Sequence, residues 1–213
     1  MARRHPKGME TRDRIMAVAL DLFAERGYAA VSMEEVAEGA GVTKGAVYYW
    51  FSDKDDLGRD LQHALYERFT QAAVAEFDPD ADIVTNMRLA FDTFLAELGT
   101  AEKARFFLRD AWTIPALDEG GRRDQATALE LVQGVLASAI DRGEIVALDP
   151  DALARVLVGA WVEATLHVLT TGDRGPTLAV IEHLVGSLHP ATATGPRPVL
   201  SPSRSSVREH QTS

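Results

Sequence analysis

The sequence predicts an all-α fold, with a small three-helix domain at the N-terminus, a larger helical bundle after it and about nine helices in total. Two observations lead to this prediction. Between its glycines and prolines the chain repeatedly places apolar residues at the i, i+3, i+4, i+7 spacing of an amphipathic helix. No stretch shows the sustained alternation of apolar and polar residues that a half-buried strand requires.

The first helix is expected over residues 10–26, where Gly27 ends it. Its apolar side chains form a single stripe that includes Ile15, Ala19, Leu22 and Phe23. A stripe of this width is typical of a helix that packs one side against a core. The first helix therefore needs partners, which the next residues supply.

Residues 31–57, VSMEEVAEGAGVTKGAVYYWFSDKDDL, have the spacing of a helix-turn-helix. Two short helices are expected over 33–40 and 44–51. Gly41 lies between them, where a positive φ would end the first helix. Ala37 is small where the second helix must approach, and Val47 is placed to fill the angle between the two helices.

Capping residues mark the starts of both short helices. Ser32 and Glu35 have the S-x-x-E spacing of a capping box, and Thr43 stands at the N-cap of the second helix. These local signals agree with the helix-turn-helix, and agreement between levels favours a single fold. The segment is therefore predicted to be a DNA-reading element.

The rest of the chain is expected to be helical as far as residue 190. A helix capped by Ser52 should run to about residue 77, and Gly120-Gly121 is expected to break the chain. Further helices are expected over 82–98, 101–113, 122–142, 152–170 and 177–188. The predicted domains are residues 1–53, which hold the helix-turn-helix, and residues 54–190, which form the helical bundle. Residues 191–213, rich in Pro, Ser, Thr and Arg, are expected to form a disordered tail.

Composition restricts the class of protein. The 213 residues include no cysteine, which excludes disulfides and thiolate metal sites, and neither a metal nor a cofactor is predicted. No secretory signal follows the basic N-terminus, and Arg155, Glu163 and His167 interrupt the longest apolar stretch. We therefore expect a cytoplasmic protein with no membrane partner.

The net charge of −10 is unevenly distributed along the chain. Residues 1–58 carry 8 basic and 10 acidic side chains, whereas residues 59–190 carry 11 and 21. The first segment is locally basic at Arg3, Arg4, Lys7, Arg12 and Arg14. This distribution would orient the N-terminal domain toward phosphate, although it does not establish binding.

The N-terminal region resembles the TetR family of transcriptional regulators. The similarity lies in residues 11–57, TRDRIMAVALDLFAERGYAAVSMEEVAEGAGVTKGAVYYWFSDKDDL, about a quarter of the chain. The resemblance implies an all-helical ligand-binding and dimerisation domain in the remainder. One position differs, because the family most often has histidine where Trp50 stands. An indole offers only an N–H donor there.

Seven residues are candidate DNA contacts. Recognition helices present their N-terminal residues to base edges, so Lys44 is placed to donate to guanine. Tyr48 and Tyr49 point about 100° apart, so at least one should be exposed to donate to phosphate. Lys54 opposes a helix dipole, which a phosphate partner would explain. The full set is Ser32, Thr43, Lys44, Gly45, Tyr48, Tyr49 and Lys54. The alternatives are a solvated lysine, tyrosines packed in the core and a serine that only caps its helix.

A second set of residues is proposed to line a ligand pocket. Aromatic and apolar side chains of the bundle, with two polar residues four positions apart, would form it: Met87, Phe91, Phe94, Phe107, Trp112, Glu163 and His167. The alternative is ordinary core packing, since helical periodicity by itself indicates only burial.

The helix over residues 152–170 is apolar nearly all round, which predicts burial on every side. A second subunit would cover its outer face and that of helix 177–188, forming a four-helix interface about a two-fold axis. The predicted contacts are Leu153, Leu157, Trp161, Ile181 and Leu184. The alternative is a central core helix in a monomer.

These observations predict a homodimeric, ligand-responsive transcriptional regulator, a repressor that a small apolar or amphipathic molecule releases from a double-stranded DNA operator. One alternative is a regulator of the same fold that responds to a protein partner or to no ligand. Another is an enzyme or small-molecule carrier with a DNA-binding head. The sequence shows no nucleophile with a base and an orienting residue, no phosphate loop and no metal-ligand spacing, so an enzyme is not predicted.

Overall fold

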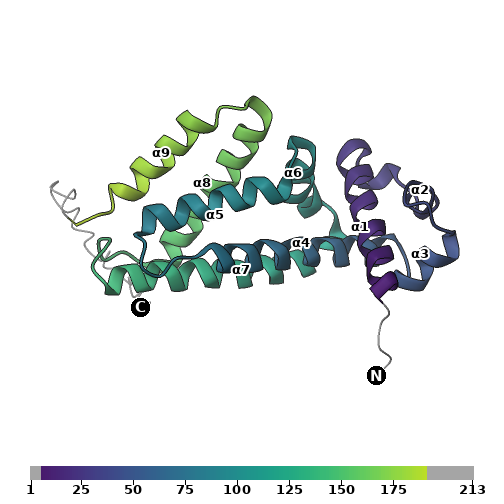
Figure 1. Cartoon of the computed structure of the whole chain (residues 1–213), viewed down its shortest axis with the longest axis horizontal. Coiled ribbons are helices and arrows are strands. Elements are labelled where there is room, and N and C mark those ends of the chain that lie inside the picture. The colour runs from purple at the N-terminus through teal and green to yellow at the C-terminus, as the bar shows by residue number, and fades with distance from the viewer. Residues whose placement is uncertain (1–5, 191–213) are drawn as a thin grey trace, which may run out of the picture.

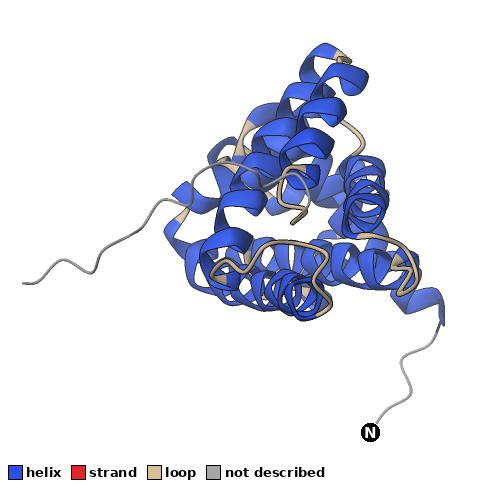
Figure 2. Cartoon of the chain, turned by 90° about the vertical axis from the view of Figure 1, so that its left-hand side faces the viewer, coloured by secondary structure: helices blue, strands red, loops and turns tan. Residues whose placement is uncertain are grey.

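The computed structural model describes residues 6–190, and this part of the chain contains helices and loops but no strand (Figure 2). Within residues 6–190, nine α-helices are accompanied by two short 3-10 helices (Figure 1). In order these are α1 (Pro6–Arg26), η1 (Tyr28–Ala30), α2 (Met33–Gly39), α3 (Lys44–Trp50), α4 (Lys54–Glu76), α5 (Ile83–Leu98), α6 (Ala101–Leu108), η2 (Asp110–Thr113), α7 (Pro115–Asp141), α8 (Pro150–Thr171) and α9 (Arg174–Gly186). The all-α prediction is confirmed.

Helices α1, α2 and α3 form a head at one end of the molecule (Figure 1). Its core contains the fully buried side chains of Ile15, Phe23, Val36 and Val47. Gly41 has a φ of 62°, the left-handed conformation expected between the two short helices. The predicted helix-turn-helix is therefore present.

The predicted caps of the two short helices are also confirmed. The Ser32 Oγ accepts from the Glu35 N–H at 3.2 Å, and the Glu35 carboxylate accepts from the Ser32 N–H at 2.8 Å. The hydrogen bond from the Ser32 backbone, followed by that from Arg26, lowers the pKa of Glu35 to about 2. Thr43 Oγ1 accepts from the Ala46 N–H at 3.2 Å and caps α3.

The cap predicted for α4 is wrong by one residue. The Asp53 carboxylate accepts from the Asp56 N–H at 2.7 Å, which makes Asp53 the N-cap. Ser52 instead donates from both its N–H and its hydroxyl to the Asp56 carboxylate. Ser52 therefore bonds to the Asp56 side chain, whereas Asp53 accepts from the Asp56 backbone and defines the start of the helix.

Helix α4 runs out of the head along the body, with α5 and α7 packed against it (Figure 1). Its first half, with Leu57, Leu61 and Leu65, belongs to the same apolar cluster as the head core. In its second half Phe69 is buried, whereas Val74 is exposed. The domain boundary predicted between residues 53 and 54 falls at the start of α4. This helix packs against both the head and the body.

Three boundaries in the body differ from the predictions. Helix α7 begins at Pro115 and continues through Gly120-Gly121 without a break. A Cβ on Gly121 would lie 2.3 Å from the Gln62 Nε2 of α4, so this glycine leaves room for the buried Gln62 side chain to pack against α7. The segment predicted as one helix over 101–113 is α6 followed by η2, and α9 starts three residues earlier than predicted. The predicted tail, residues 191–213, lies outside the described residues.

Candidate DNA-binding surface and ligand cavity

Helix α3 presents a group of exposed residues. Tyr49 is 79% exposed and Tyr48 is 42% exposed, whereas the neighbouring Val47 is fully buried. Thr43, Lys44 and Gly45 are exposed at the start of the helix. No atom lies closer than 4.0 Å to a Cβ built on Gly45, so its backbone is open to close approach. All five residues are therefore accessible, and their DNA contacts stay a prediction.

Lys44 has an acidic partner on α2. Its ammonium forms an exposed ion pair with the Glu34 carboxylate. The hydrogen bond between the two side chains raises the pKa of Lys44 and lowers that of Glu34. The Lys44 Nζ also lies 5.6 Å from the centre of the Tyr48 ring. A base contact by Lys44 therefore requires an exposed ion pair to open.

Trp50, the position that differs from the family, packs on the same surface. Its ring meets the exposed Tyr49 edge to face, with centroids 5.2 Å apart. Trp50 itself is half-buried. The tryptophan thus supports the ring of Tyr49 from the side and restricts the orientations that this exposed tyrosine can take.

The structure does not support the predicted phosphate contact of Lys54. The Lys54 Nζ donates to the carbonyls of Tyr28 and Val31 at 2.9 and 3.0 Å, and it lies 3.4 Å from the carbonyl of Ala29. It also lies 4.6 Å from the centre of the Tyr28 ring. These acceptors around η1 explain why a lysine stands at a helix start, so no phosphate is required.

Ser32 is likewise engaged within the domain. Besides accepting from Glu35, its hydroxyl donates to the Glu35 carboxylate at 2.8 Å. Capping accounts for both roles of this hydroxyl, and a phosphate contact by Ser32 stays a prediction.

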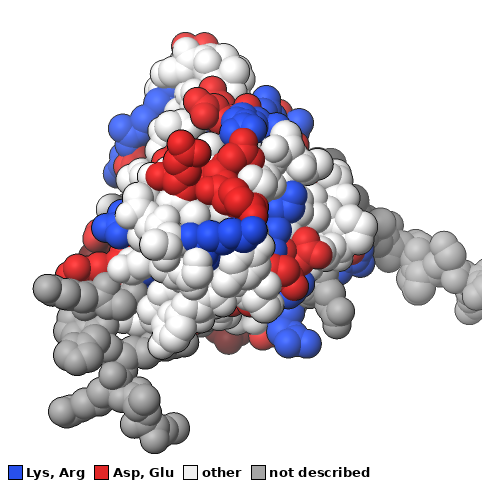
Figure 3. Space-filling view, turned by 90° about the vertical axis from the view of Figure 1, so that its right-hand side faces the viewer, with Lys and Arg blue, Asp and Glu red and all other residues white. Residues whose placement is uncertain are grey.

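The charges on the end of the head are mixed. Basic and acidic side chains are interspersed on this face, with a group of acidic side chains near its centre (Figure 3). Arg12, counted above as part of a basic segment, forms an ion pair with Asp60 at 2.8 Å. This face of the head is therefore not uniformly basic.

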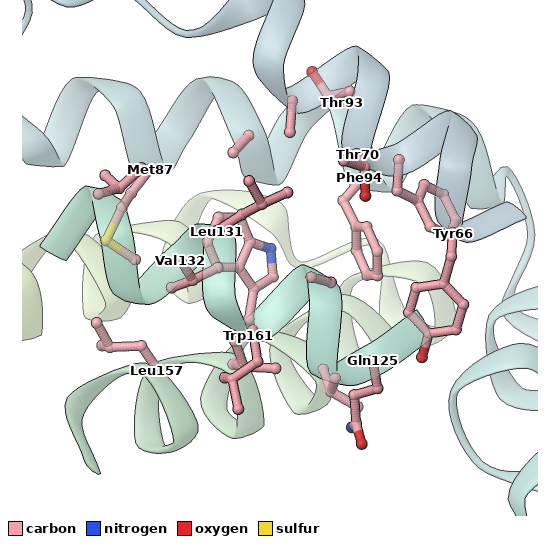
Figure 4. Close-up of a pocket in the computed structure, with 18 of the residues that line it drawn as sticks. Tyr66, Thr70, Met87, Thr93, Phe94, Gln125, Leu131, Val132, Leu157 and Trp161 are labelled. Carbon is pink, nitrogen blue, oxygen red and sulfur yellow. The ribbon is translucent and has the colours of Figure 1, made fainter. Parts of the chain in front are cut away.

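The body contains a cavity of about 400 Å³ between α4, α5, α6, α7 and α8 (Figure 4). Most of its lining is aliphatic or aromatic. The polar members are few and uncharged: Tyr66, Thr70, Asn86, Thr93, Gln125 and the indoles of Trp112 and Trp161. A mostly apolar cavity with a few convergent polar groups is the usual form of a small-molecule site.

Four of the seven predicted pocket residues line this cavity: Met87, Phe94, Phe107 and Trp112. The other three were assigned wrongly. Phe91 points away and packs with Ala164 and Val168 in a separate apolar cluster. Glu163 pairs with Arg109 at the surface, and His167 is exposed. The i, i+4 spacing placed these two polar residues on one face correctly, but that face is the outer one.

The sequence prediction missed several lining residues. Tyr66, Phe69 and Thr70 come from α4, a helix for which no pocket residue was predicted. Burial, followed by the charge of Asp124, raises the pKa of Tyr66, so its hydroxyl stays protonated at neutral pH. The only sequence signal for these residues was the apolar stripe of α4, which does not distinguish a cavity wall from a filled core.

Helices α8 and α9 carry an exposed apolar surface. Val156 is 69%, Val180 60% and Leu184 51% exposed. By length and composition α8 could also cross a membrane. In this fold, however, it packs against α5, α6, α7 and α9.

Only Leu184 of the five predicted dimer contacts lies on this exposed surface. Leu153, Leu157, Trp161 and Ile181 are half-buried and pack against clusters inside the protomer. Leu157 and Trp161 also line the cavity. Because α8 is apolar nearly all round, its sequence did not show which side faces outward.

A helix-turn-helix head joined by a continuous helix to an all-helical body with an apolar cavity defines a class of DNA-binding regulators. Comparison with known families agrees. The family described as "Bacterial regulatory proteins, tetR family" matches residues 15–61, and the "Tetracyclin repressor-like, C-terminal domain" matches residues 84–189. The chain belongs to the TetR family of transcriptional regulators.

Individual relatives cover different lengths of the chain. Shigella flexneri AcrR is 48% identical over 55 residues, 26% of either protein, and Pseudomonas putida SrpR is 30% identical over 142 residues, 64% of either. The chain thus matches about a quarter of the first and just under two thirds of the second. TtgR, also of Pseudomonas putida, is 27% identical over 169 residues, 76% of this chain and 80% of TtgR.

Solved structures share the whole fold. The fatty acid degradation regulator FadR from Bacillus halodurans has a TM-score of 0.73 at 18% identity, covering 88% of this chain and 97% of its own. Bacillus subtilis FadR, solved in complex with stearoyl-CoA, has a TM-score of 0.72 at 20% identity. The match covers 84% of this chain and 97% of the FadR chain. At this identity the likeness concerns the fold alone.

Proposed function

We propose that the chain is a homodimeric repressor that a small, mostly apolar molecule releases from its DNA operator. The observation that carries this proposal is the cavity of about 400 Å³, whose walls include α4 and α6, body helices that both pack against α1 of the head. A filled core, as expected for a regulator without a ligand, would leave no such space.

Helix α6 contacts the head and the cavity through neighbouring residues. Phe106 packs against Phe23 of α1, with ring centroids 5.6 Å apart. Phe107, the next residue, lines the cavity and meets Phe69 of α4 at 5.3 Å. Lys103 of α6 forms an ion pair with Asp21 of α1 at 2.6 Å. A ligand that moves α6 would therefore alter contacts that hold α1.

The exposed apolar surface of α8 and α9 supports the homodimer. A second copy placed about a two-fold axis would bury Val156, Val180 and Leu184. Two heads related by such an axis would read half-sites about one helical turn apart, ~10 bp, or a small multiple of this spacing. A ligand changes DNA affinity only if it binds the two states of the dimer unequally.

Two relatives are consistent with this proposal. TtgR is named as a transcriptional regulator, and Bacillus subtilis FadR was solved in complex with stearoyl-CoA. The proposal places this protein in the cytoplasm, where bacterial operator DNA lies.

The experiment is selection of duplexes from a random library by the full chain, followed by fluorescence anisotropy on the enriched duplex. We expect enrichment of a two-fold symmetric site, weaker binding of that duplex by Lys44→Ala, and an unchanged dimer in sedimentation. A library that yields no enriched sequence, or an enriched site without symmetry, would overturn the proposed function.

A further inference from the structure

We propose that the ligand of the cavity is an uncharged molecule whose apolar body carries an internal hydrogen-bond acceptor, such as a ketone or ester carbonyl, which pairs with the indole N–H of Trp161. This inference rests on the proposed function, because it assigns the chemical class of molecule that the cavity takes.

The lining of the cavity disfavours a charged ligand. No Lys, Arg, His, Asp or Glu is found among the lining residues within the described part of the chain. A buried ion without a partner of opposite charge is strongly disfavoured. At the end of the cavity formed by Tyr66 and Gln125, burial and then the charge of Asp124 raise the pKa of Tyr66, and the same negative charge would repel an anion bound there. The carboxylate of Asp124 is itself paired with His63 at 3.0 Å.

The indole N–H of Trp161 is a hydrogen-bond donor that lacks an acceptor among the described residues. Its Nε1 is buried and has no hydrogen-bond partner in the described part of the protein. The lining residues next to it on α8, Leu157, Val158 and Val162, have no side-chain acceptor. Buried indole N–H groups normally find a partner, so an acceptor from the ligand would complete this one.

The position of Trp161 in the cavity determines where that acceptor lies in the ligand. The indole lies among the lining residues, between Met87 and Leu157 at one end and Tyr66 and Gln125 at the other (Figure 4). An acceptor that reaches the middle of the cavity must be flanked by ligand atoms on both sides. Around it the walls are apolar, which favours hydrophobic or aromatic groups at the flanks.

Four probes that share one body separate the possible chemistries. Benzophenone carries a central carbonyl, diphenylmethane a central methylene, diphenylacetate a central carboxylate and benzhydrylamine a central ammonium. Isothermal titration of the full-length dimer at neutral pH should show benzophenone binding at least tenfold more tightly than either ion. It should also bind about fivefold more tightly than diphenylmethane, the effect of one hydrogen bond.

Trp161→Phe tests the proposed donor, because phenylalanine keeps an aromatic wall without the N–H. We expect benzophenone to bind the variant no more tightly than diphenylmethane does, while diphenylmethane affinity stays within about twofold of the original, since the apolar wall is kept. Trp112→Phe, at the other lining tryptophan, is the matched control and should keep the preference for the ketone.

The outcomes separate this inference from the proposed function. Tighter binding of either ion, the same ketone preference in Trp161→Phe, or no binding of any probe overturns the inference. Anisotropy on the enriched duplex with the same protein samples then shows whether DNA binding stands. If only the inference is wrong, the protein still binds the enriched duplex. If the proposed function is wrong, no specific DNA binding is measured.

Discussion

Lys44 and Lys54 both stand at the start of a helix, and their surroundings give them different roles. Lys44 is exposed beside Tyr48 and pairs with another exposed side chain, Glu34. Lys54 donates to carbonyls around η1 and lies against Tyr28. A lysine at a helix start opposes the helix dipole in both cases, so sequence position alone could not separate them.

Glu34→Gln should strengthen operator binding severalfold. The substitution frees the Lys44 ammonium for a base and removes a negative charge from the surface that faces phosphate. Fluorescence anisotropy on the enriched duplex measures the change. Lys44→Ala should weaken binding at least tenfold. Glu34→Gln made in the Lys44→Ala background should increase affinity less than it does in the original protein, because only the removal of the negative charge then contributes. Equal affinities of Glu34→Gln and the original protein would contradict the role of Lys44.

Lys54→Met should lower the free energy of unfolding by about 2 kcal/mol, because the carbonyls of Tyr28 and Val31 lose a charged donor. Urea denaturation measures this loss. The salt dependence of operator binding should keep its slope, since no phosphate contact disappears. A shallower slope with unchanged stability would show that the original phosphate prediction was right.

At the scale of elements, local signals set most helix starts in the head. Asp53, Thr43 and Ser32 cap their helices through hydrogen bonds that span three residues, and such short-range patterns can be predicted from sequence. The capping box and the positive φ of Gly41 were predicted for this reason. The choice between Ser52 and Asp53 depended on which oxygen reaches a backbone N–H, which the sequence does not show.

At Gly120-Gly121 the helix break predicted from the local sequence is absent from the structure. Two adjacent glycines normally favour a break, yet α7 passes through them. The reason is a tertiary contact, since Gly121 faces Gln62 across the interface between α4 and α7. The two faces of α8 could not be assigned for the same kind of reason. Its apolar residues predicted burial, but the partner on each side depends on packing that no periodicity encodes.

The two glycines should therefore respond oppositely to alanine. Nothing lies within 4 Å of a Cβ on Gly120, so Gly120→Ala should raise the free energy of unfolding by about 1 kcal/mol through helix propensity. Gly121→Ala should lower it by about 1 kcal/mol, because overpacking against the buried Gln62 amide outweighs the same gain in helix propensity. Denaturant titrations of both variants make the comparison.

Gln62→Ala provides the control for this pair. It removes the amide that the Gly121→Ala methyl group would meet, and that amide already lacks hydrogen-bond partners within the described protein. The double variant should therefore recover most of the stability lost in Gly121→Ala. Stabilisation by Gly121→Ala alone would contradict the close approach of α4 and α7.

For the whole molecule, the exposed apolar surface of α8 and α9 lies apart from the head, which leaves both heads of a dimer free to face DNA. The walls of the cavity include α8, which carries part of the apolar surface, and α4, which packs against α1 of the head. A conformational change in the body can thus alter the distance between the heads. The ligand would then change the distance between the two heads and leave the DNA-contacting surface of each head unchanged.

Val156→Arg combined with Leu184→Arg should dissociate the dimer, because both side chains are exposed in the protomer and would be buried in the dimer. Sedimentation velocity at micromolar concentration measures the change. Val74→Arg, at a valine that is 62% exposed on α4, is the control and should leave the dimer intact. A dimer that survives the double substitution would require a different interface.

Coupling between the cavity and the head can be measured as a change in DNA affinity when the cavity is filled. Anisotropy should give the affinity of the dimer for the enriched duplex before and after saturation with a compound that calorimetry shows to bind once per protomer. We predict at least tenfold weaker DNA binding with the cavity filled. By linkage, the compound should bind the DNA complex more weakly by the same factor. Equal DNA affinities with the cavity empty and saturated would contradict the account.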